Sequence, residues 1–258
     1  MTSSASAGLR QFRTITVPLG GEAAVTIEDR DGTRPFLLLH GGAGPRSMTG
    51  FADLLAERAR SRVLVPTHPG FAGTVRPDRL DSTRSLAIAY LELIEELDLS
   101  GLTLVGNSFG GWLAAEIALL GSPRVRNAVI VDGIGADVPG HPVADVSGLS
   151  PSEIAALSWH DPSRAPALRP DVPALLAYTG PAMVDPTLLE RLGGLDLPVH
   201  VVWGADDRIV DPEYGRAYAA AIPASRFTVL PRTGHLPQLE RPEELLAAIL
   251  DVVDDRPT

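Results

Sequence analysis

Three residues whose types and order suit nucleophilic catalysis are Ser108, Asp207 and His235. Ser108 lies in Gly106-Asn107-Ser108-Phe109-Gly110, directly after the apolar run Leu102 to Val105. A serine hydroxyl attacks a carbonyl at neutral pH only when a base removes its proton, and the base needs an acceptor that orients it. The pattern therefore predicts Ser108 as the nucleophile, His235 as the base and Asp207 as the orienting acid.

A tight strand-to-helix turn must hold Ser108, because a helical pattern from Trp112 to Leu120 follows the apolar run almost at once. Gly106 and Gly110 lack a Cβ atom, which allows neighbouring backbones to approach the turn closely. We expect Ser108 to adopt a strained conformation that projects its hydroxyl above the sheet.

Six histidines compete for the role of base. His235 follows the last predicted strand, in a loop on the edge where the functional loops gather. His68 also lies in an edge loop and is the strongest rival, whereas His40 ends a strand and is expected to fix the shape of its loop. The remaining three lie within a strand or an inserted segment: His200, His141 and His160.

Two neighbouring aspartates follow the strand Val199 to Trp203. Asp207 stands three residues after Gly204, far enough for the chain to turn and direct it at His235. Asp206 is expected to face solvent or to cap the turn. Asp132, which also follows a strand, is the alternative position for the acid.

The elements that position these residues alternate between strand and helix. Predicted strands cover residues 12–17, 23–29, 35–40, 62–66, 102–105, 125–131, 199–203 and 226–230. Predicted helices cover residues 51–59, 86–97, 112–120, 212–221 and 242–253, with Ser82 as a cap. The first two strands are expected to form an antiparallel hairpin. The alternation predicts an α/β protein with an open, mostly parallel eight-stranded sheet flanked by helices.

Residues 134–195 break this alternation, since they are rich in proline and contain two short helical patterns near 152–159 and 186–192 but no convincing strand. We interpret them as a small helical cap inserted into a core formed by residues 1–133 and 196–258. Trp159, Tyr178, Met183 and Leu188 are candidates to line an apolar substrate pocket, or simply to hold the cap together.

Composition excludes several kinds of chemistry. The chain has no cysteine, and every basic residue is arginine, so thiolate nucleophiles, Fe–S clusters, disulfides and Schiff-base lysines are absent. A net charge of −10 argues against nucleic acid or anionic lipid as a partner. Residues 1–8 lack the features of a secretory signal, and no run is long enough to span a membrane, so we expect a cytoplasmic protein.

The order of the three residues and the loops around them resemble the α/β-hydrolases over essentially the whole chain. Residues 40–45 look like the oxyanion loop of that family, 68–74 like the loop after its fourth strand, and 106–110 like its nucleophile elbow. Residues 203–210 resemble its acid loop, and Gly234-His235 its histidine loop.

This resemblance implies an oxyanion hole formed by the backbone N–H groups of Phe109 and Gly42. It also implies that substrate contacts come from loops around the triad, which adds Gly41, His68 and Leu236 to the candidate substrate-binding residues. The expected chemistry needs no cofactor. No paired ligand spacing predicts a metal site.

The expected activity is hydrolysis of an ester, lactone or thioester of a small to medium hydrophobic substrate through an acyl-enzyme. Hydrolases of meta-cleavage products, which break carbon–carbon bonds with the same triad, are the alternative. They usually carry a tryptophan shortly after the histidine, whereas this chain has Leu236-Pro237-Gln238-Leu239. A ligand-binding protein that retains the triad is a third reading. Ser108 argues against the dehalogenases and epoxide hydrolases of this fold, which use an aspartate nucleophile. The sequence leaves homodimer formation open.

Overall fold

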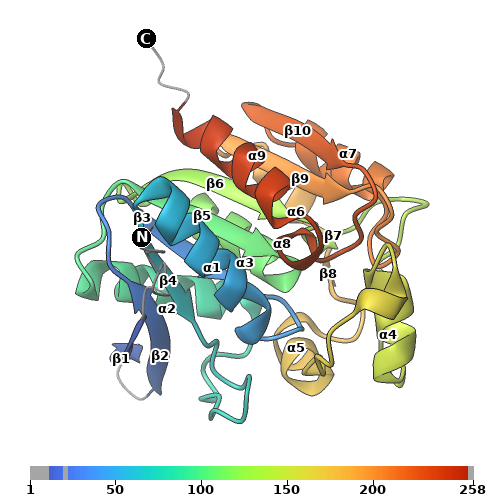
Figure 1. Cartoon of the computed structure of the whole chain (residues 1–258), viewed down its shortest axis with the longest axis horizontal. Coiled ribbons are helices and arrows are strands. Elements are labelled where there is room, and N and C mark those ends of the chain that lie inside the picture. The colour runs from blue at the N-terminus through green and yellow to red at the C-terminus, as the bar shows by residue number, and fades with distance from the viewer. Residues whose placement is uncertain (1–11, 20–22, 255–258) are drawn as a thin grey trace, which may run out of the picture.

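An eight-stranded sheet forms the centre of the computed structural model, which describes residues 12–19 and 23–254 (Figure 1). The expectation for residues 1–8 lies outside the described residues. The strands are β1 (Arg13–Leu19), β2 (Ala23–Arg30), β3 (Pro35–Leu39), β4 (Arg62–Pro66), β5 (Leu102–Asn107), β6 (Val125–Val131), β9 (Val199–Gly204) and β10 (Ser225–Leu230).

The order of the strands across the sheet is β1-β2-β4-β3-β5-β6-β9-β10. β1 pairs antiparallel with β2, and β2 pairs antiparallel with β4, so the predicted opening hairpin is confirmed. All other neighbours are parallel. The carboxyl ends of β3, β5, β6, β9 and β10 therefore meet at one edge, which brings together the loops that carry the predicted triad.

Helices cover both faces of the sheet. Figure 1 shows α1 (Arg46–Ala59) and α9 (Pro242–Asp254) on the viewer's side, where their apolar side chains pack into one core cluster. The helices α2 (Thr83–Glu96), α3 (Phe109–Leu119) and α7 (Pro212–Ala220) contribute to a second cluster. Phe36 and Leu38 of β3 belong to the first cluster and Leu37 and Leu39 to the second, which explains why this strand is apolar throughout.

The one N-terminal cap that the sequence predicts is present. Ser82 caps α2 as predicted, because its hydroxyl accepts the backbone N–H of Ser85 and the Ser85 hydroxyl accepts the N–H of Ser82.

A short helix that the sequence did not predict, α8 (Pro237–Glu240), follows the loop of His235. None of the helices in the described ranges is both long and apolar enough to cross a membrane.

Residues 134–195 contain more structure than the sequence predicted. The helices α4 (Pro151–Ser158) and α6 (Leu188–Leu192) match the two expected patterns, but α5 (Val172–Thr179) and the 3-10 turn η1 (Pro162–Arg164) were not predicted. The expectation of no strand was wrong, since β7 (Gly135–Ala136) and β8 (Val184–Asp185) form a small parallel pair. Two-residue strands carry no periodicity, and Pro173 disguised the first turn of α5, where proline is tolerated.

Polar contacts fasten this segment to the core. The Arg191 guanidinium donates to both carboxylate oxygens of buried Glu116 on α3, at 2.6 and 2.9 Å, and also to Asp185. The Tyr178 hydroxyl donates to the Pro69 carbonyl at 2.9 Å. Because these contacts join α6 and α5 to different core elements, the segment is held over the edge of the sheet where the functional loops meet.

Candidate active site

Ser108 occupies the sharp turn between β5 and α3 in an unusual conformation. Its φ is 57° and its ψ is −120°, a left-handed backbone that L-residues rarely adopt. A Cβ atom at Gly106 would lie 1.9 Å from the Gly110 carbonyl oxygen, and one at Gly110 would lie 2.0 Å from that of Leu39. The strain predicted for Ser108 is thus present, and the two glycines serve close backbone approach rather than a positive φ.

His235 and Asp207 form a buried hydrogen-bonded pair. His235 Nδ1 lies 2.7 Å from Asp207 Oδ2, and the side chains of both residues are almost fully buried. Asp207 Oδ1 accepts the backbone N–H groups of Ile209 at 2.8 Å and Val210 at 3.2 Å. Since the carboxylate accepts hydrogen on each oxygen, its orientation is fixed, and Nδ1 of His235 is the protonated nitrogen.

The backbone around His235 is held as firmly as its ring. Its N–H donates to the Ser158 carbonyl of α4 at 2.7 Å, and its carbonyl accepts Asn107 Nδ2 at 2.9 Å. Gln238 Nε2 in turn donates to Asn107 Oδ1 at 3.0 Å. Sequence reasoning missed Asn107, although its position directly before Ser108 was a usable signal.

Ser108 and His235 line the same cavity, with 7% and 5% of their surface exposed. The described residues include no hydrogen bond between the Ser108 hydroxyl and the imidazole. In unliganded enzymes this bond is often long and shortens in the complex with substrate. Asp207 does not line the cavity, but its carboxylate bonds to His235 Nδ1, so the three residues that the sequence singled out form one connected group around the cavity.

The loop after β3 passes directly over Ser108. A Cβ atom at Gly41 would lie 2.7 Å from Ser108 Cβ and 3.2 Å from its Oγ, so only glycine fits there. Gly42 lines the cavity, and its carbonyl accepts the N–H of Asp171 at the start of α5. Phe109 is the first residue of α3, where a backbone N–H has no partner within the helix. Gly42 thus lies in the cavity wall and Phe109 directly follows Ser108, and the oxyanion hole predicted for their N–H groups stays a prediction.

A pair of fully buried imidazoles supports that loop. His40 Nε2 accepts the His68 backbone N–H at 3.2 Å, so His40 Nδ1 carries the hydrogen and donates to the Gly41 carbonyl at 2.8 Å. His68 Nε2 donates to the His40 carbonyl at 3.1 Å, and its Nδ1 accepts the Tyr90 hydroxyl at 2.6 Å. Burial lowers the pKa of His40 to about 4 and that of His68 well below its usual value, so both rings are neutral.

His68 therefore does not contact the cavity, contrary to its prediction as a substrate-binding residue, because both ring nitrogens bond within the core. Tyr178 and Trp159 are also absent from the cavity lining. The Tyr178 ring stacks on Phe109 with centroids 5.6 Å apart, and Trp159 lines a neighbouring hollow. Leu188 is buried in the core.

Met183 and Leu236 do line the cavity, which has a volume of about 70 Å³. Sequence reasoning missed most of the remaining wall, since it comes from short pieces of the segment 134–195 and from the acid loop. These apolar residues are Ile134, Val146, Ile154, Val172, Leu175 and Ile209.

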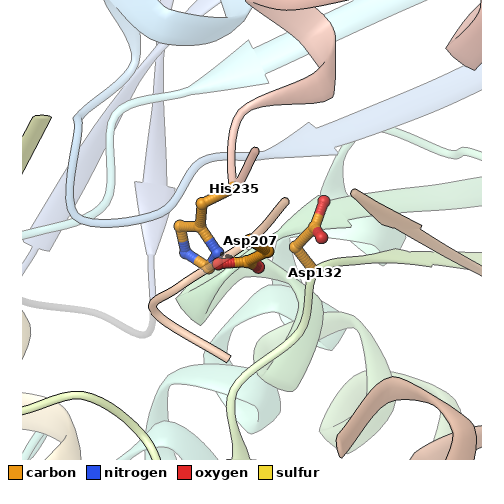
Figure 2. A group of neighbouring side chains, drawn as sticks. All are labelled: Asp132, Asp207 and His235. Carbon is orange, nitrogen blue, oxygen red and sulfur yellow. Dashed lines mark hydrogen bonds and ion pairs between the residues drawn. The ribbon is translucent and has the colours of Figure 1, made fainter. Parts of the chain in front are cut away.

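The other two candidate aspartates have different surroundings. The partly exposed Asp206 carboxylate bonds to His160 Nδ1 at 2.8 Å, away from the pair. Asp132 is fully buried beside Asp207, and one oxygen or nitrogen from each of Asp132, Asp207 and His235 lies within 4.8 Å of the others (Figure 2). Such a group could hold a metal ion, but here both Asp207 oxygens accept N–H hydrogens and His235 Nδ1 is protonated, which fits a hydrogen-bonded Asp–His pair better.

Comparison with known proteins identifies the same architecture. The sequence profile described as "Alpha/beta hydrolase family" matches residues 36–248. A 2-hydroxymuconate semialdehyde hydrolase from Pseudomonas putida is 30% identical over 242 residues, which cover 81% of this chain and 83% of that relative.

Two solved structures share the fold. A meta-cleavage product hydrolase from Pseudomonas fluorescens superposes with a TM-score of 0.76 at 21% identity, covering 94% of this chain and 97% of the other. A thermophilic esterase from Thermogutta terrifontis superposes with a TM-score of 0.73 at 25% identity, covering 93% and 97%. The predicted fold class is confirmed.

Proposed function

Because the chain belongs to the alpha/beta hydrolase family, we propose that it hydrolyses a small molecule through Ser108, and that the bond it breaks is a carbon–carbon bond of the meta-cleavage-product type. The observation that carries the hydrolase assignment is the buried Asp207–His235 pair, whose imidazole lines the same cavity as strained Ser108. The bond type is supported by the 2-hydroxymuconate semialdehyde hydrolase, a relative at 30% identity. This proposal replaces ester hydrolysis as the first reading of the sequence.

The proposed reaction begins when Ser108 Oγ adds to the carbonyl carbon while His235 Nε2 takes its proton. Asp207 stabilises the resulting imidazolium through Nδ1. The bond from that carbon to its neighbour then breaks, and the electron pair passes to a leaving carbon that is conjugated with an oxo acid. This carbon takes the proton that His235 Nε2 removed from Ser108, which leaves His235 neutral again. Water, deprotonated by His235, hydrolyses the acyl-enzyme and restores Ser108.

An oxyanion hole at Gly42 and Phe109 would stabilise the negative charge that develops on the carbonyl oxygen. The two N–H groups are backbone donors fixed by the start of α3 and by the Gly42–Asp171 contact, so they need no rearrangement during the reaction. Removing one such donor in other enzymes costs about 10²–10³ in rate.

Residues 134–195 would act as the cap that shapes the substrate pocket. α4 supplies Ile154 and Ser158, and α5 supplies Leu175, to the wall of the cavity that Ser108 also lines. With a volume of about 70 Å³, the cavity fits a small acyl portion rather than a long chain.

One observation favours ester hydrolysis as a second candidate. Among the described residues that line the cavity there is no arginine, whereas 2-hydroxymuconate semialdehyde carries carboxylate. Residues 236–239 after His235 contain no tryptophan, although the carbon–carbon hydrolases usually have one shortly after this histidine. An uncharged ester, lactone or thioester would meet only apolar walls, and the structurally similar esterase is 25% identical.

A matched set of substrates separates the two candidates. The wild type and Ser108→Ala would be assayed with a 2-hydroxy-6-oxo-dienoate, with 4-nitrophenyl esters of graded acyl length and with a lactone. We expect the dienoate to have the highest kcat/KM, with all turnover lost in Ser108→Ala. A preference for the short esters by more than tenfold would assign the protein to the second candidate.

A fluorophosphonate probe tests the shared part of both candidates. Ser108 should be labelled rapidly in the wild type and not in His235→Ala, because the probe requires an activated serine. An unreactive Ser108 in the folded wild type would instead indicate the ligand-binding reading.

A further inference from the structure

Two carboxyl groups, rather than one, stand behind His235. Asp132 follows β6 and Asp207 follows β9, and these strands are neighbours in the sheet. Asp132 is 0% exposed and Asp207 is 3% exposed. Figure 2 shows Asp207 between the imidazole and Asp132. One polar atom of each of the three residues lies within 4.8 Å of the others.

The two carboxyl groups have unequal hydrogen-bond partners. Asp207 accepts two backbone N–H groups on Oδ1 and the imidazole on Oδ2. Asp132 accepts a single N–H, from Gly204 at 2.7 Å on Oδ1, and no N–H or O–H group of the described residues donates to its buried Oδ2. A buried carboxylate with one donor is poorly stabilised, whereas a protonated Asp132 can donate its O–H to the Asp207 carboxylate, with which its side chain interacts.

The charges around Asp132 also favour its protonated form. Burial raises the pKa of Asp132 well above its usual value, and the neighbouring Asp207 and Glu240 carboxylates raise this pKa further. The groups that face it are Asp207 from the loop after β9, His235 from the loop after β10 and Glu240 from α8. Two carboxylates at this separation cannot both ionise without a large cost, so one of them retains a proton.

We propose that Asp132 carries a proton on Oδ2 and acts as a positioning residue, which confines the negative charge of the pair to Asp207. The neutral acid anchors the acid loop through Gly204 without adding a second charge near the imidazole. Its role in turnover rests on the proposed function, whereas its protonation state does not.

A protonated Asp132 predicts how the substitution Asp132→Asn affects the pH dependence of Ser108 labelling. Asn is isosteric with a protonated aspartic acid and tolerates the positive φ of 46° at this position. Asp132→Asn should therefore leave the acid limb of the pH profile for fluorophosphonate labelling of Ser108 unchanged. If Asp132 were ionised, removing its charge would destabilise the imidazolium and move that limb to lower pH by about 1 to 3 units.

A double variant tests the coupling between the two carboxyl groups. In Asp207→Asn, Asp132 becomes the sole carboxyl near His235, and it can ionise and partly stabilise the imidazolium. Asp207→Asn/Asp132→Asn should then label at least about tenfold more slowly than Asp207→Asn, although Asp132→Asn alone changes little. Equal rates for the single Asp207 variant and the double variant would contradict the proposal.

Infrared spectroscopy reads the protonation state directly. At pH 8 the wild type should show the carbonyl band of a protonated carboxylic acid, which Asp132→Asn lacks and the exposed control Asp137→Asn retains. Absence of that band in the folded wild type would overturn the assignment. A wild type that shows the band but does not label at Ser108 would disprove the proposed function and leave the protonation state of Asp132 intact.

Discussion

Two buried groups of histidines lie near Ser108, and they differ in whether a carboxylate contacts the imidazole. On one side, His235 faces the Asp207 carboxylate, which supports a positive charge on the ring. On the other side, His40 and His68 bond only to backbone groups and to the Tyr90 hydroxyl. Burial alone therefore does not make a histidine a base. An imidazole can accept a proton in the interior only where a carboxylate is present to stabilise the charge.

The largest expected effect concerns the residue between the two groups. Ser108→Ala should lower kcat by about 10⁶-fold, because no other side chain of the turn can form the acyl-enzyme. Steady-state kinetics with the best substrate of the panel measures the loss, and thermal unfolding serves as the control for folding. Retention of more than a hundredth of the activity would mean that water, not Ser108, attacks the substrate.

The next effect tests the charged side of the comparison. Asp207→Asn should lower kcat by about 10⁴-fold, because the amide favours the wrong tautomer of His235 and cannot stabilise the imidazolium. The matched control is Asp206→Asn, which changes a neighbouring carboxylate that bonds to His160 at the surface and should have a mild effect. Equal losses in the two variants would show that the acid has been assigned to the wrong residue.

The choice between these two aspartates illustrates what the sequence can predict. Strand ends of a parallel sheet meet at one edge, so positions 108, 207 and 235 could be brought together from strand order alone. Three residues of spacing after Gly204 were enough to direct Asp207 at His235. These inferences succeeded because each depends on backbone topology and on one local turn.

The direction of a buried side chain was much harder to predict. His68 lies in an edge loop, as expected, but its ring points into the core, where the Tyr90 hydroxyl is a partner from a distant helix. Most residues of the cavity wall were not predicted for a related reason, since Val146, Ile154 and Leu175 come from separate pieces of the segment 134–195. No short window of sequence shows that such pieces converge. The helix α5 was missed because proline and short length hid its pattern.

The neutral, buried His40 should make the stability of the protein depend on pH in the acidic range. His40 has a pKa lowered to about 4 by burial, so the unfolded state, with the usual pKa near 6.5, binds the proton more readily. The stability that neutral His40 contributes is complete above about pH 6.5 and is lost as the pH falls toward 4, by about 3 kcal/mol. Denaturant unfolding at a series of pH values would show this loss as a difference between the wild type and His40→Asn, which cannot titrate.

Asp132 should show the opposite dependence, which sharpens the contrast. Its raised pKa means that the folded state holds the proton more tightly, so its cost to stability is relieved as the pH falls toward the usual value of about 4. Relative to the wild type, Asp132→Asn should therefore lose more stability on acidification, and His40→Asn should lose less. If the pH dependence of the unfolding free energy changed in the same direction in both variants, Asp132 and His40 would not differ in the way proposed.

The smallest effect concerns the hydroxyl that sets the tautomer of His68. Tyr90→Phe removes the donor to His68 Nδ1 and leaves that buried nitrogen without a partner, at a cost of about 1–3 kcal/mol in unfolding free energy. Tyr218→Phe is a matched control, because the Tyr218 hydroxyl is equally buried but has no hydrogen-bond partner within the described part of the chain. It should be neutral or slightly stabilising. If both variants lost the same stability, the loss would come from tyrosine packing in general. A specific loss in Tyr90→Phe, with labelling of Ser108 preserved, would show that the imidazole pair supports the oxyanion loop without taking part in proton transfer.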